Sequence, residues 1–370
     1  MSVFIITHPF YGNYGGMLQA YALQQTLKLN SIESYIYQYY EYPRIPFLKE
    51  IARIIYNRTR EVLATIIPKL GKKNISPILY CRNGQNFLYR YVKYVSSEGP
   101  QTSAKSWIVG SDQVWRAEHV KFWGELPFFF LEDQPKEMRA KSIAYAASFG
   151  LDKWAATEDE ANRCSTLLRD FKAVSVREHS GIEICRQRMG VNAVQMPDPT
   201  LLLGEEQYSS LINKEKTWKP ESGYIAAYVL DRTQEQDTIL ISCAQQTQME
   251  VQHLTPSATA KKRRDRFPIS VPQWLRLIRD CKYLVTDSFH GCVFAIIFNK
   301  PFVCLGNKNR GSARFDSLLK TFGLQNRLVA NRDVDTILQT LNTPIDWLRV
   351  NSIREQERAR GIEFLTKNLV

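Results

Sequence analysis

Short apolar runs that end in small or polar residues, each followed by a helix-like segment, recur along this chain of 370 residues. The alternation predicts an α/β protein with parallel sheets, because a helix must carry the chain back before the next parallel strand begins. In open parallel sheets, ligands bind in the crevice outside the carboxyl ends of the strands. The residues that follow the runs are therefore candidates for a functional site. The expected strands cover 2–8, 31–40, 106–115, 141–150, 173–178, 194–203, 223–230, 249–255, 282–288 and 300–306.

The pattern divides into two α/β units of unequal size, with a cleft between them. We expect an N-terminal Rossmann-like domain over residues 1–205, a C-terminal Rossmann-like domain over 206–340 and a terminal helix over 341–370. Residues 44–72 interrupt the first unit with a basic amphipathic pattern that predicts a helix pair. This insertion either packs on the domain as a helical hairpin or contacts a membrane surface.

The chain is basic, since 49 lysines and arginines against 37 acidic residues give a formal net charge of +12. Such an excess favours anionic partners such as phosphates, carboxylates and anionic lipid, or it is a solvated surface with no partner. The most basic stretch, KKRRDR at 261–266, is interpreted as part of a loop over 258–270. Because no nucleic-acid-binding motif accompanies it, we expect no nucleic-acid partner.

The seven cysteines are scattered without metal-ligand spacing. Their odd number and apolar surroundings predict a reducing compartment, with neither disulfides nor a structural metal. No cofactor motif is found, so neither a metal nor a cofactor is expected. The first residues lack the pattern of a signal peptide, and no uncharged apolar stretch reaches about 18 residues, which together predict a cytoplasmic protein.

The segment TDSFHG at 286–291 places an acid, a hydroxyl and an imidazole at the start of an apolar helix. Asp287 or Ser288 can cap that helix and do nothing more. A cap does not account for His290 in the first turn, where free N–H groups and the helix dipole attract an anion. Gly291 permits a ligand to approach the backbone closely. We therefore expect this segment to face an anionic ligand.

Two further segments offer residues to the same edge of the first sheet. The glycine-rich stretch GNYGG at 12–16 is either a tight turn before a helix or a loop on the cleft floor, with Asn13, Gly15 and Gly16 facing a substrate. After the strand at 106–115, Ser111 and Asp112 follow a glycine, and Asp112 is either a base, a ligand of the acceptor or a helix cap.

Arg177 ends the strand at 173–178 and is a candidate for binding an anion. A guanidinium group can grip phosphate or carboxylate with two parallel hydrogen bonds. The same geometry suits an ion pair with Glu178 or Asp198, which would make Arg177 a structural residue. The sequence leaves both interpretations open.

Taken in order, these stretches resemble the polysaccharide pyruvyl transferase family, from residue 12 to about residue 330. The resemblance implies two Rossmann-like domains facing across a cleft, as in B-type glycosyltransferases. It implies transfer of a pyruvyl group from phosphoenolpyruvate to a sugar of a surface polysaccharide or its lipid-linked precursor, giving a pyruvate ketal and phosphate, with possible peripheral membrane contact. The motifs are GNYGGMLQAYALQ, IVGSDQVW, YAASFG, SVRE, PDPTLLL, TDSFHG and RGSARFDSLL.

The resemblance also assigns expected roles. His290 is the proton donor or a phosphate partner, and Asp112 is the base or binds the acceptor. Where the family has Arg-Leu-His, this chain has Ser-Phe-His at 288–290, so one donor-binding cation is missing from that place. Either a later arginine replaces it, or the protein is a glycosyltransferase of the same architecture with a nucleotide-sugar donor. The expected donor-binding residues are Arg177, Ser288, Gly291, Arg310 and Arg314, and the expected acceptor or cleft residues are Asn13, Gly15, Gly16 and Ser111.

Overall fold

The computed structural model describes residues 2–9, 13–39, 86–96, 104–121, 124–221, 223–257, 265, 267–306, 312–330 and 332–369. The expected helix pair at 44–72, most of the basic stretch at 261–266, and Arg310 lie outside the described residues.

The N-terminal half is built on a seven-stranded sheet in which every neighbouring pair is parallel. Its order is β3-β2-β1-β4-β5-β6-β7, so the strand order reverses direction between β1 and β4. Its central strands are buried on both faces, as helices on both sides of a parallel sheet require. The strands are β1 Ser2–Ile6, β2 Glu33–Gln38, β3 Tyr94–Ser96, β4 Ser106–Val109, β5 Ile143–Ala147, β6 Ala173–Val176 and β7 Val194–Gln195.

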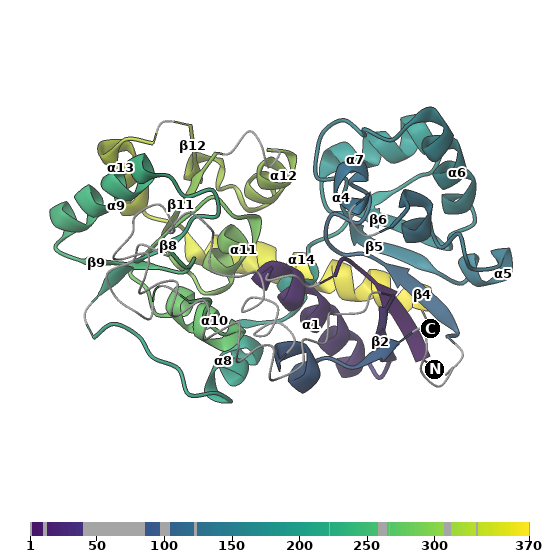
Figure 1. The fold of residues 1–370 in the computed structure, drawn as a ribbon, viewed down its shortest axis with the longest axis horizontal. Coiled ribbons are helices and arrows are strands. Elements are labelled where there is room, and N and C mark those ends of the chain that lie inside the picture. The colour runs from purple at the N-terminus through teal and green to yellow at the C-terminus, as the bar shows by residue number, and fades with distance from the viewer. Residues whose placement is uncertain are drawn as a thin grey trace, which may run out of the picture.

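Helices cover both faces of this sheet (Figure 1). The first is almost entirely buried, because it lies between the sheet and the other half of the molecule. The helical segments are α1 Tyr14–Leu29, α4 Ala117–Val120, η2 Leu126–Phe130, α5 Lys136–Arg139, α6 Glu158–Leu168, α7 His179–Ile184, η3 Cys185–Met189 and η4 Pro199–Leu202.

The C-terminal half has its own five-stranded parallel sheet, in the order β12-β11-β10-β8-β9. Its strands are β8 Tyr224–Tyr228, β9 Glu250–His253, β10 Tyr283–Thr286, β11 Phe302–Leu305 and β12 Leu328–Val329. Its helical segments are α8 Glu205–Asn213, α9 Gln234–Thr247, α10 Val271–Arg279, α11 Phe289–Ile297, α12 Ala313–Phe322, η7 Gln325–Arg327 and α13 Val334–Asn342. Two sheets with helices on both faces confirm the predicted pair of Rossmann-like units (Figure 1).

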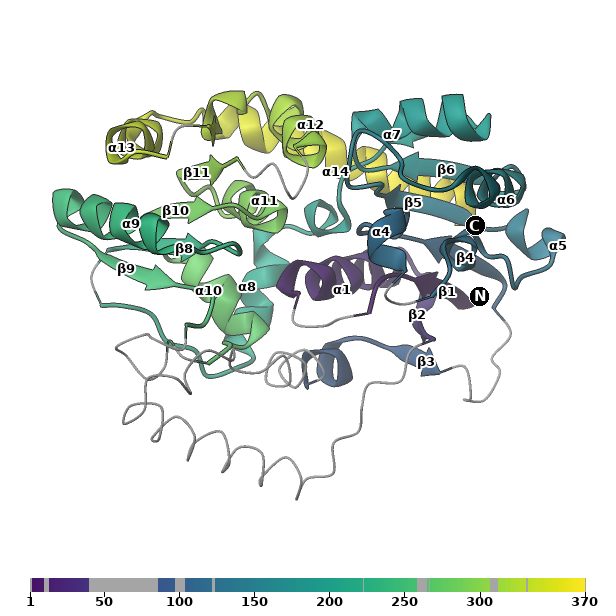
Figure 2. The ribbon, with the colours of Figure 1, turned by 45° about the horizontal axis from the view of Figure 1, so that its top comes forward.

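The last helix, α14 Trp347–Leu369, runs from the second domain back across the first (Figure 2). Three of its arginines donate hydrogen bonds to backbone carbonyls along this path. Arg354 bonds to the Ile297 carbonyl at 2.9 Å in the second domain, and Arg358 to the Leu202 carbonyl at 3.0 Å in the first. The predicted terminal helix is confirmed, and it ties the two domains together. None of the described helices is long and apolar enough to cross a membrane.

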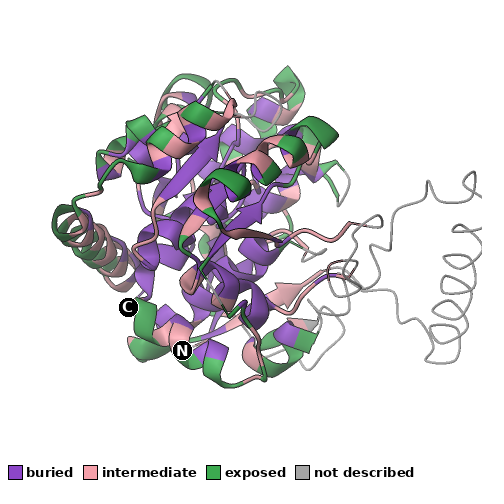
Figure 3. Ribbon diagram, turned by 90° about the vertical axis from the view of Figure 1, so that its left-hand side faces the viewer, coloured by how far each residue is buried: buried purple, intermediate pink, exposed green. Residues whose placement is uncertain are grey.

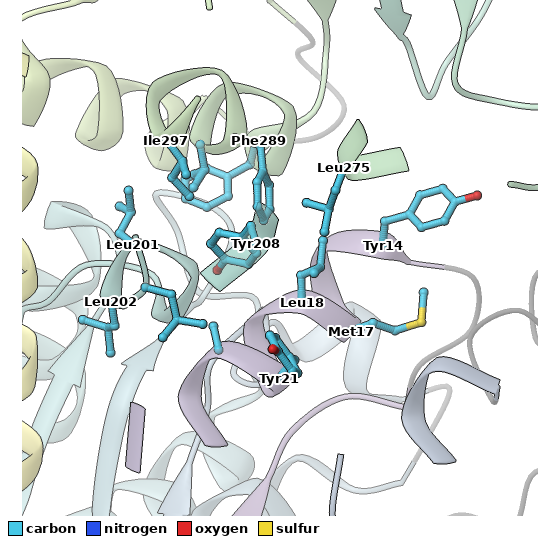
Figure 4. Close-up of a cluster of buried hydrophobic side chains, with 14 of the residues drawn as sticks. Tyr14, Met17, Leu18, Tyr21, Leu201, Leu202, Tyr208, Leu275, Phe289 and Ile297 are labelled. Atoms are coloured by element: carbon cyan, nitrogen blue, oxygen red, sulfur yellow. The ribbon is translucent and has the colours of Figure 1, made fainter. Parts of the chain in front are cut away.

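The largest hydrophobic core continues from one domain into the other. Tyr14 of α1 stacks on Trp274 of α10 at 5.6 Å between ring centres, and its hydroxyl donates to the Ile269 carbonyl at 2.7 Å. Figure 4 shows side chains of α1 facing those of α10 and α11 across this contact. Figure 3 shows the buried strands and helices of the interior. The first turn of α1 is therefore held firmly against the second domain.

Two local predictions are wrong. The strand expected at 194–203 is only two residues long, because Pro197 and Pro199 have no N–H to continue the ladder, and a 3₁₀ turn replaces it. Gly15 and Gly16 lie in the first turn of α1 rather than in a loop, since Asn13 already takes the N-cap position. The domain boundaries at about residues 205 and 340 stay a prediction.

Candidate functional site

The carboxyl ends of β4, β6 and β7 face the amino-terminal turns of α11 and α12 from the other domain. One buried carboxylate lies where they meet. Asp198, which follows β7, is 1% exposed, and its Oδ2 lies 2.9 Å from Nη2 of Arg177 and 3.5 Å from Nε2 of His290. The residues expected to converge, Arg177 and His290, therefore meet at the same oxygen atom although they belong to different domains.

The Asp198 carboxylate is fixed from its other side. Its Oδ1 accepts hydrogen bonds from the backbone N–H of Thr200 at 2.9 Å and from the Thr200 hydroxyl at 2.6 Å. Burial alone would raise the pKa of Asp198, but the positive charge of Arg177 and the contacts with His290 and Thr200 outweigh burial and hold that pKa well below its ordinary value. Asp198 is therefore an anion at neutral pH.

Arg177 makes the ion pair that the sequence left open, and its partner is Asp198 rather than Glu178. It also donates a hydrogen bond to the Ser111 hydroxyl. These contacts do not use the whole guanidinium group: within the part of the chain that the structure describes, the buried Nε and Nη1 of Arg177 have no hydrogen-bond partner. Glu178 turns away and accepts from the backbone N–H groups of Phe149 and Gly150 at 2.7 and 3.1 Å.

A second buried arginine, Arg314, lies beside Arg177 in the first turn of α12. The guanidinium carbons of the two arginines lie 5.1 Å (Arg177) and 5.7 Å (Arg314) from the ring centre of Phe289. Burial and the like charge of Arg177 lower the pKa of Arg314 to about 10, so it is still a cation at neutral pH. Two positive charges thus share one aromatic ring at the domain boundary.

His290 is enclosed by residues of the other domain. The imidazole lies against the backbone of Gly15 in α1, where a Cβ atom would be only 2.0 Å from Nδ1 of His290. Only glycine fits at this position, because real Cβ atoms essentially never approach another atom within 3.0 Å. Gly15, expected to face a substrate, instead packs against His290.

Asp112 lies near these groups and does not cap a helix, since α4 begins five residues later, at residue 117. Its Oδ1 accepts from the backbone N–H of Gln113 at 2.9 Å. Burial would raise the pKa of Asp112, but the surrounding positive charges, led by that of Arg177, hold it below its ordinary value. A Cβ atom on Gly16 would lie 3.3 Å from Oδ2 of Asp112 and 3.2 Å from Nδ2 of Asn13. Asn13, Gly16 and Asp112 therefore lie together.

The segment at 286–291 differs from expectation in three ways. Asp287 accepts from two backbone N–H groups of the loop after β8 rather than capping α11. Ser288 takes the N-cap position, yet its side chain makes no capping hydrogen bond. A Cβ atom on Gly291 would lie 2.2 Å from Oγ1 of Thr286, so this glycine lets α11 pack on its own strand rather than leaving room for a ligand.

A pocket opens beside this cluster, with a volume of about 340 Å³ including its open mouth. Its charged wall contains Arg177, Arg314, Asp198 and Glu357, and the Phe289 ring also lines it. The apolar wall is formed by Met196, Leu201, Leu318 and Phe322. Among the described residues, no group of three or more His, Cys, Asp or Glu side chains is arranged to hold a metal ion.

Residues 13–309 match the sequence model of the polysaccharide pyruvyl transferase family. The chain belongs to this family. The match includes all the site residues from Asn13 to His290, whereas Arg314 lies beyond it. Family membership identifies a transferase of polysaccharide biosynthesis with a glycan acceptor.

Solved structures similar to this family member include two carbohydrate-active enzymes. One is the UDP-GlcNAc 2-epimerase of Neisseria meningitidis bound to UDP-GlcNAc, with 11% identity, a TM-score of 0.49, and coverage of 100% of this chain and 99% of that one. Another is a spinosyn rhamnosyltransferase, with 11% identity, a TM-score of 0.46 and full coverage of both chains. No curated protein sequence matches the chain.

Sequence reasoning considered Asp198 only as a possible partner of Arg177 and gave Phe289 no role. The signal for Asp198 was its place between two prolines directly after an expected strand, where a polar side chain is held at the sheet edge. Phe289 gave no such signal, because an aromatic residue beside an apolar helix is ordinarily part of a core.

Proposed function

We propose that this protein transfers the pyruvyl group of phosphoenolpyruvate to a glycan, forming a pyruvate ketal. The observation that carries the proposal is the pair of buried arginines, Arg177 and Arg314, that line one pocket around Phe289. Arginine side chains bind phosphate and carboxylate groups through parallel hydrogen bonds. Phosphoenolpyruvate carries one phosphate and one carboxylate, so a pocket lined by two guanidinium groups suits it.

The donor would be held by the two guanidinium groups. Arg177 offers the Nε and Nη1 donors that its ion pair leaves unused. Arg314 takes over as the cation that the family pattern places two residues before the histidine. Ser288, at the N-cap of α11, would contribute its hydroxyl to the same ligand.

The chemistry then needs an acid near the donor methylene and an acceptor hydroxyl near the adjacent carbon. His290 protonates the methylene carbon while the first sugar hydroxyl attacks C2 and gives its proton to Asp112. The bond between C2 and the phosphate oxygen breaks, and phosphate leaves. A second hydroxyl then adds to C2. Of the two hydroxyl protons, one restores the proton that His290 gave to the new methyl group, and the other leaves with phosphate.

The acceptor would approach from the amino terminus of α1, where Asn13, Gly16 and Asp112 lie together. Ser111 would stay in place as the hydrogen-bond partner of Arg177. We propose a sugar of a surface polysaccharide or its lipid-linked precursor as acceptor. Reaction in the cytoplasm, with peripheral contact at the membrane, belongs to the same proposal.

The test combines purified protein, phosphoenolpyruvate and a panel of acceptor glycans. We expect release of one phosphate for each new ketal methyl group seen by proton NMR. Thermal-shift measurements with phosphoenolpyruvate and with nucleotide sugars provide an independent comparison of donors. Stabilisation by nucleotide sugars alone, without phosphate release from phosphoenolpyruvate, would replace the proposal with a glycosyltransferase.

A further inference from the structure

The imidazole of His290 belongs to the second domain, yet two residues of the first domain enclose it. Nε2 lies 3.5 Å from Oδ2 of Asp198, and Nδ1 lies beside the backbone of Gly15. His290 is 6% exposed and Asp198 is 1% exposed, so solvent does not compete for these contacts. The ring therefore has little freedom to turn.

The Asp198 side of this contact is rigid. The backbone and hydroxyl of Thr200 hold Oδ1, while Nη2 of Arg177 lies 2.9 Å from Oδ2. A carboxylate is an acceptor only, so the nitrogen of His290 that faces Asp198 must carry a proton to interact favourably. A proton on Nε2 would face the Asp198 carboxylate, so this contact favours the Nε2–H form of the imidazole.

The Gly15 side is equally constrained. Tyr14, its neighbour in α1, stacks on Trp274 and donates to the Ile269 carbonyl, both in the second domain. The first turn of α1 cannot retreat from α11 without breaking these contacts. A side chain at Gly15 would therefore have to move the imidazole, because its Cβ would lie within 2.6 Å of three ring atoms of His290.

We propose that Asp198 and Gly15 are positioning residues for His290. Asp198 fixes which ring nitrogen carries the resident proton, and Gly15 fixes the place of the ring. Building on the proposed function, the two residues hold in place the imidazole that delivers the proton to the donor. His290 is therefore held in position to act as an acid only when α1 and α11 are docked as they are here.

The first test follows the imidazole itself. Two-dimensional ¹⁵N NMR of histidine-labelled protein, with the signals of His290 assigned from His290→Gln, reports the tautomer of the neutral ring. We expect the Nε2–H form in the unaltered protein and a mixture of tautomers in Asp198→Asn. A ring that keeps one tautomer in both proteins would overturn the role of Asp198. This readout does not depend on the identity of the donor.

The second test uses steady-state kinetics. We expect Asp198→Asn and Gly15→Ala to lower kcat about 100-fold or more, which is the loss of rate that follows when a general acid is misplaced. The KM for phosphoenolpyruvate should not rise, because Arg177 and Arg314 remain and Asp198→Asn removes a negative charge beside them. A rise in the donor KM with unchanged kcat would show that these residues serve donor binding alone, against the proposal.

Matched controls separate positioning from general damage. Asp170→Asn breaks another arginine–aspartate ion pair of 2.9 Å, with Arg139, away from the site. Gly223→Ala adds a Cβ at ordinary contact distance, 3.9 Å from Lys282. Both should keep kcat within a factor of about two. Equal losses of kcat in the control and test variants would contradict the positioning role of Asp198 and Gly15. Absence of phosphate release by the unaltered protein would contradict the proposed function instead.

Discussion

Arg177 and Arg314 come from different domains and contact the same aromatic ring, that of Phe289. Their guanidinium carbons lie 5.1 and 5.7 Å from its centre. Burial lowers the pKa of Arg314, and the like charge of Arg177 lowers it further. An anion bound between Arg177 and Arg314 would reduce the repulsion between their charges. Because the two arginines come from different domains, we expect donor binding to favour the docked arrangement of the domains.

Replacing Arg314 by glutamine should weaken donor binding. We expect the KM for phosphoenolpyruvate to rise roughly 10- to 100-fold, the effect of losing a hydrogen bond to a charged group at about 1.5–3 kcal/mol. Initial rates over a range of donor concentrations provide the measurement. Lys320→Gln removes a positive charge from an exposed position of the same helix and should leave KM unchanged. Equal effects of the two variants would point to long-range charge rather than direct binding.

Replacing His290 by glutamine should abolish turnover with little change in the melting temperature. Glutamine suits this test better than alanine, because the His290 side chain is 6% exposed and packs against Gly15, and alanine would leave a cavity there. We expect kcat to fall about 10²- to 10⁴-fold, the contribution of a general acid. Rate assays and thermal unfolding on one preparation give both quantities. Intact turnover in a strongly destabilised variant would make His290 a structural residue.

Part of this site was predictable from local patterns. Strand ends can be read from the chain, because apolar runs stop where the sheet edge meets solvent or a ligand. Arg177, Asp112 and His290 were found in this way. Arg314 was named only as a substitute for a missing cation, from its place in the following segment.

The remaining features depend on contacts between distant parts of the chain. Asp198 and His290 are 92 residues apart, and nothing local indicates that they share a contact. The crowding of Gly15 by His290 depends on how the two domains dock, so the glycine pair alone could not reveal it. Gly291 was misread for a related reason: the atom that fills its space belongs to Thr286, five residues earlier across a strand–helix turn.

Glu178 should make stability depend on pH. Burial raises the pKa of this carboxyl above its usual 4.5, so the folded state holds a proton that the unfolded state releases as pH rises above about 4.5. The contribution of Glu178 to the free energy of unfolding therefore falls as pH rises towards its folded pKa. Glu178→Gln has no such dependence. We expect the stability of Glu178→Gln, relative to the unaltered protein, to increase between pH 4.5 and 7.5 in thermal unfolding experiments. A difference that stays constant over this range would show that the pKa of Glu178 is not raised in the folded protein.

Arg327 offers a test of stability away from the site. It is 1% exposed, and its guanidinium group donates to the carbonyls of Thr340 at 2.5 Å and of Thr343 at 2.6 Å, at the end of α13. Arg327→Met keeps the aliphatic volume but leaves these acceptors without their donor. Each unsatisfied buried group costs about 1–3 kcal/mol, so the melting temperature should fall by several degrees.

A surface arginine provides the comparison for Arg327. Arg188 pairs with Glu158 at 2.8 Å, but the two side chains are 43% and 79% exposed, and such pairs contribute little. Arg188→Met should therefore leave the melting temperature nearly unchanged. Because α13 packs on the second sheet and not on the pocket, both variants should keep the donor KM of the unaltered protein. A change in that KM for Arg327→Met would mean that the end of α13 communicates with the site through α12.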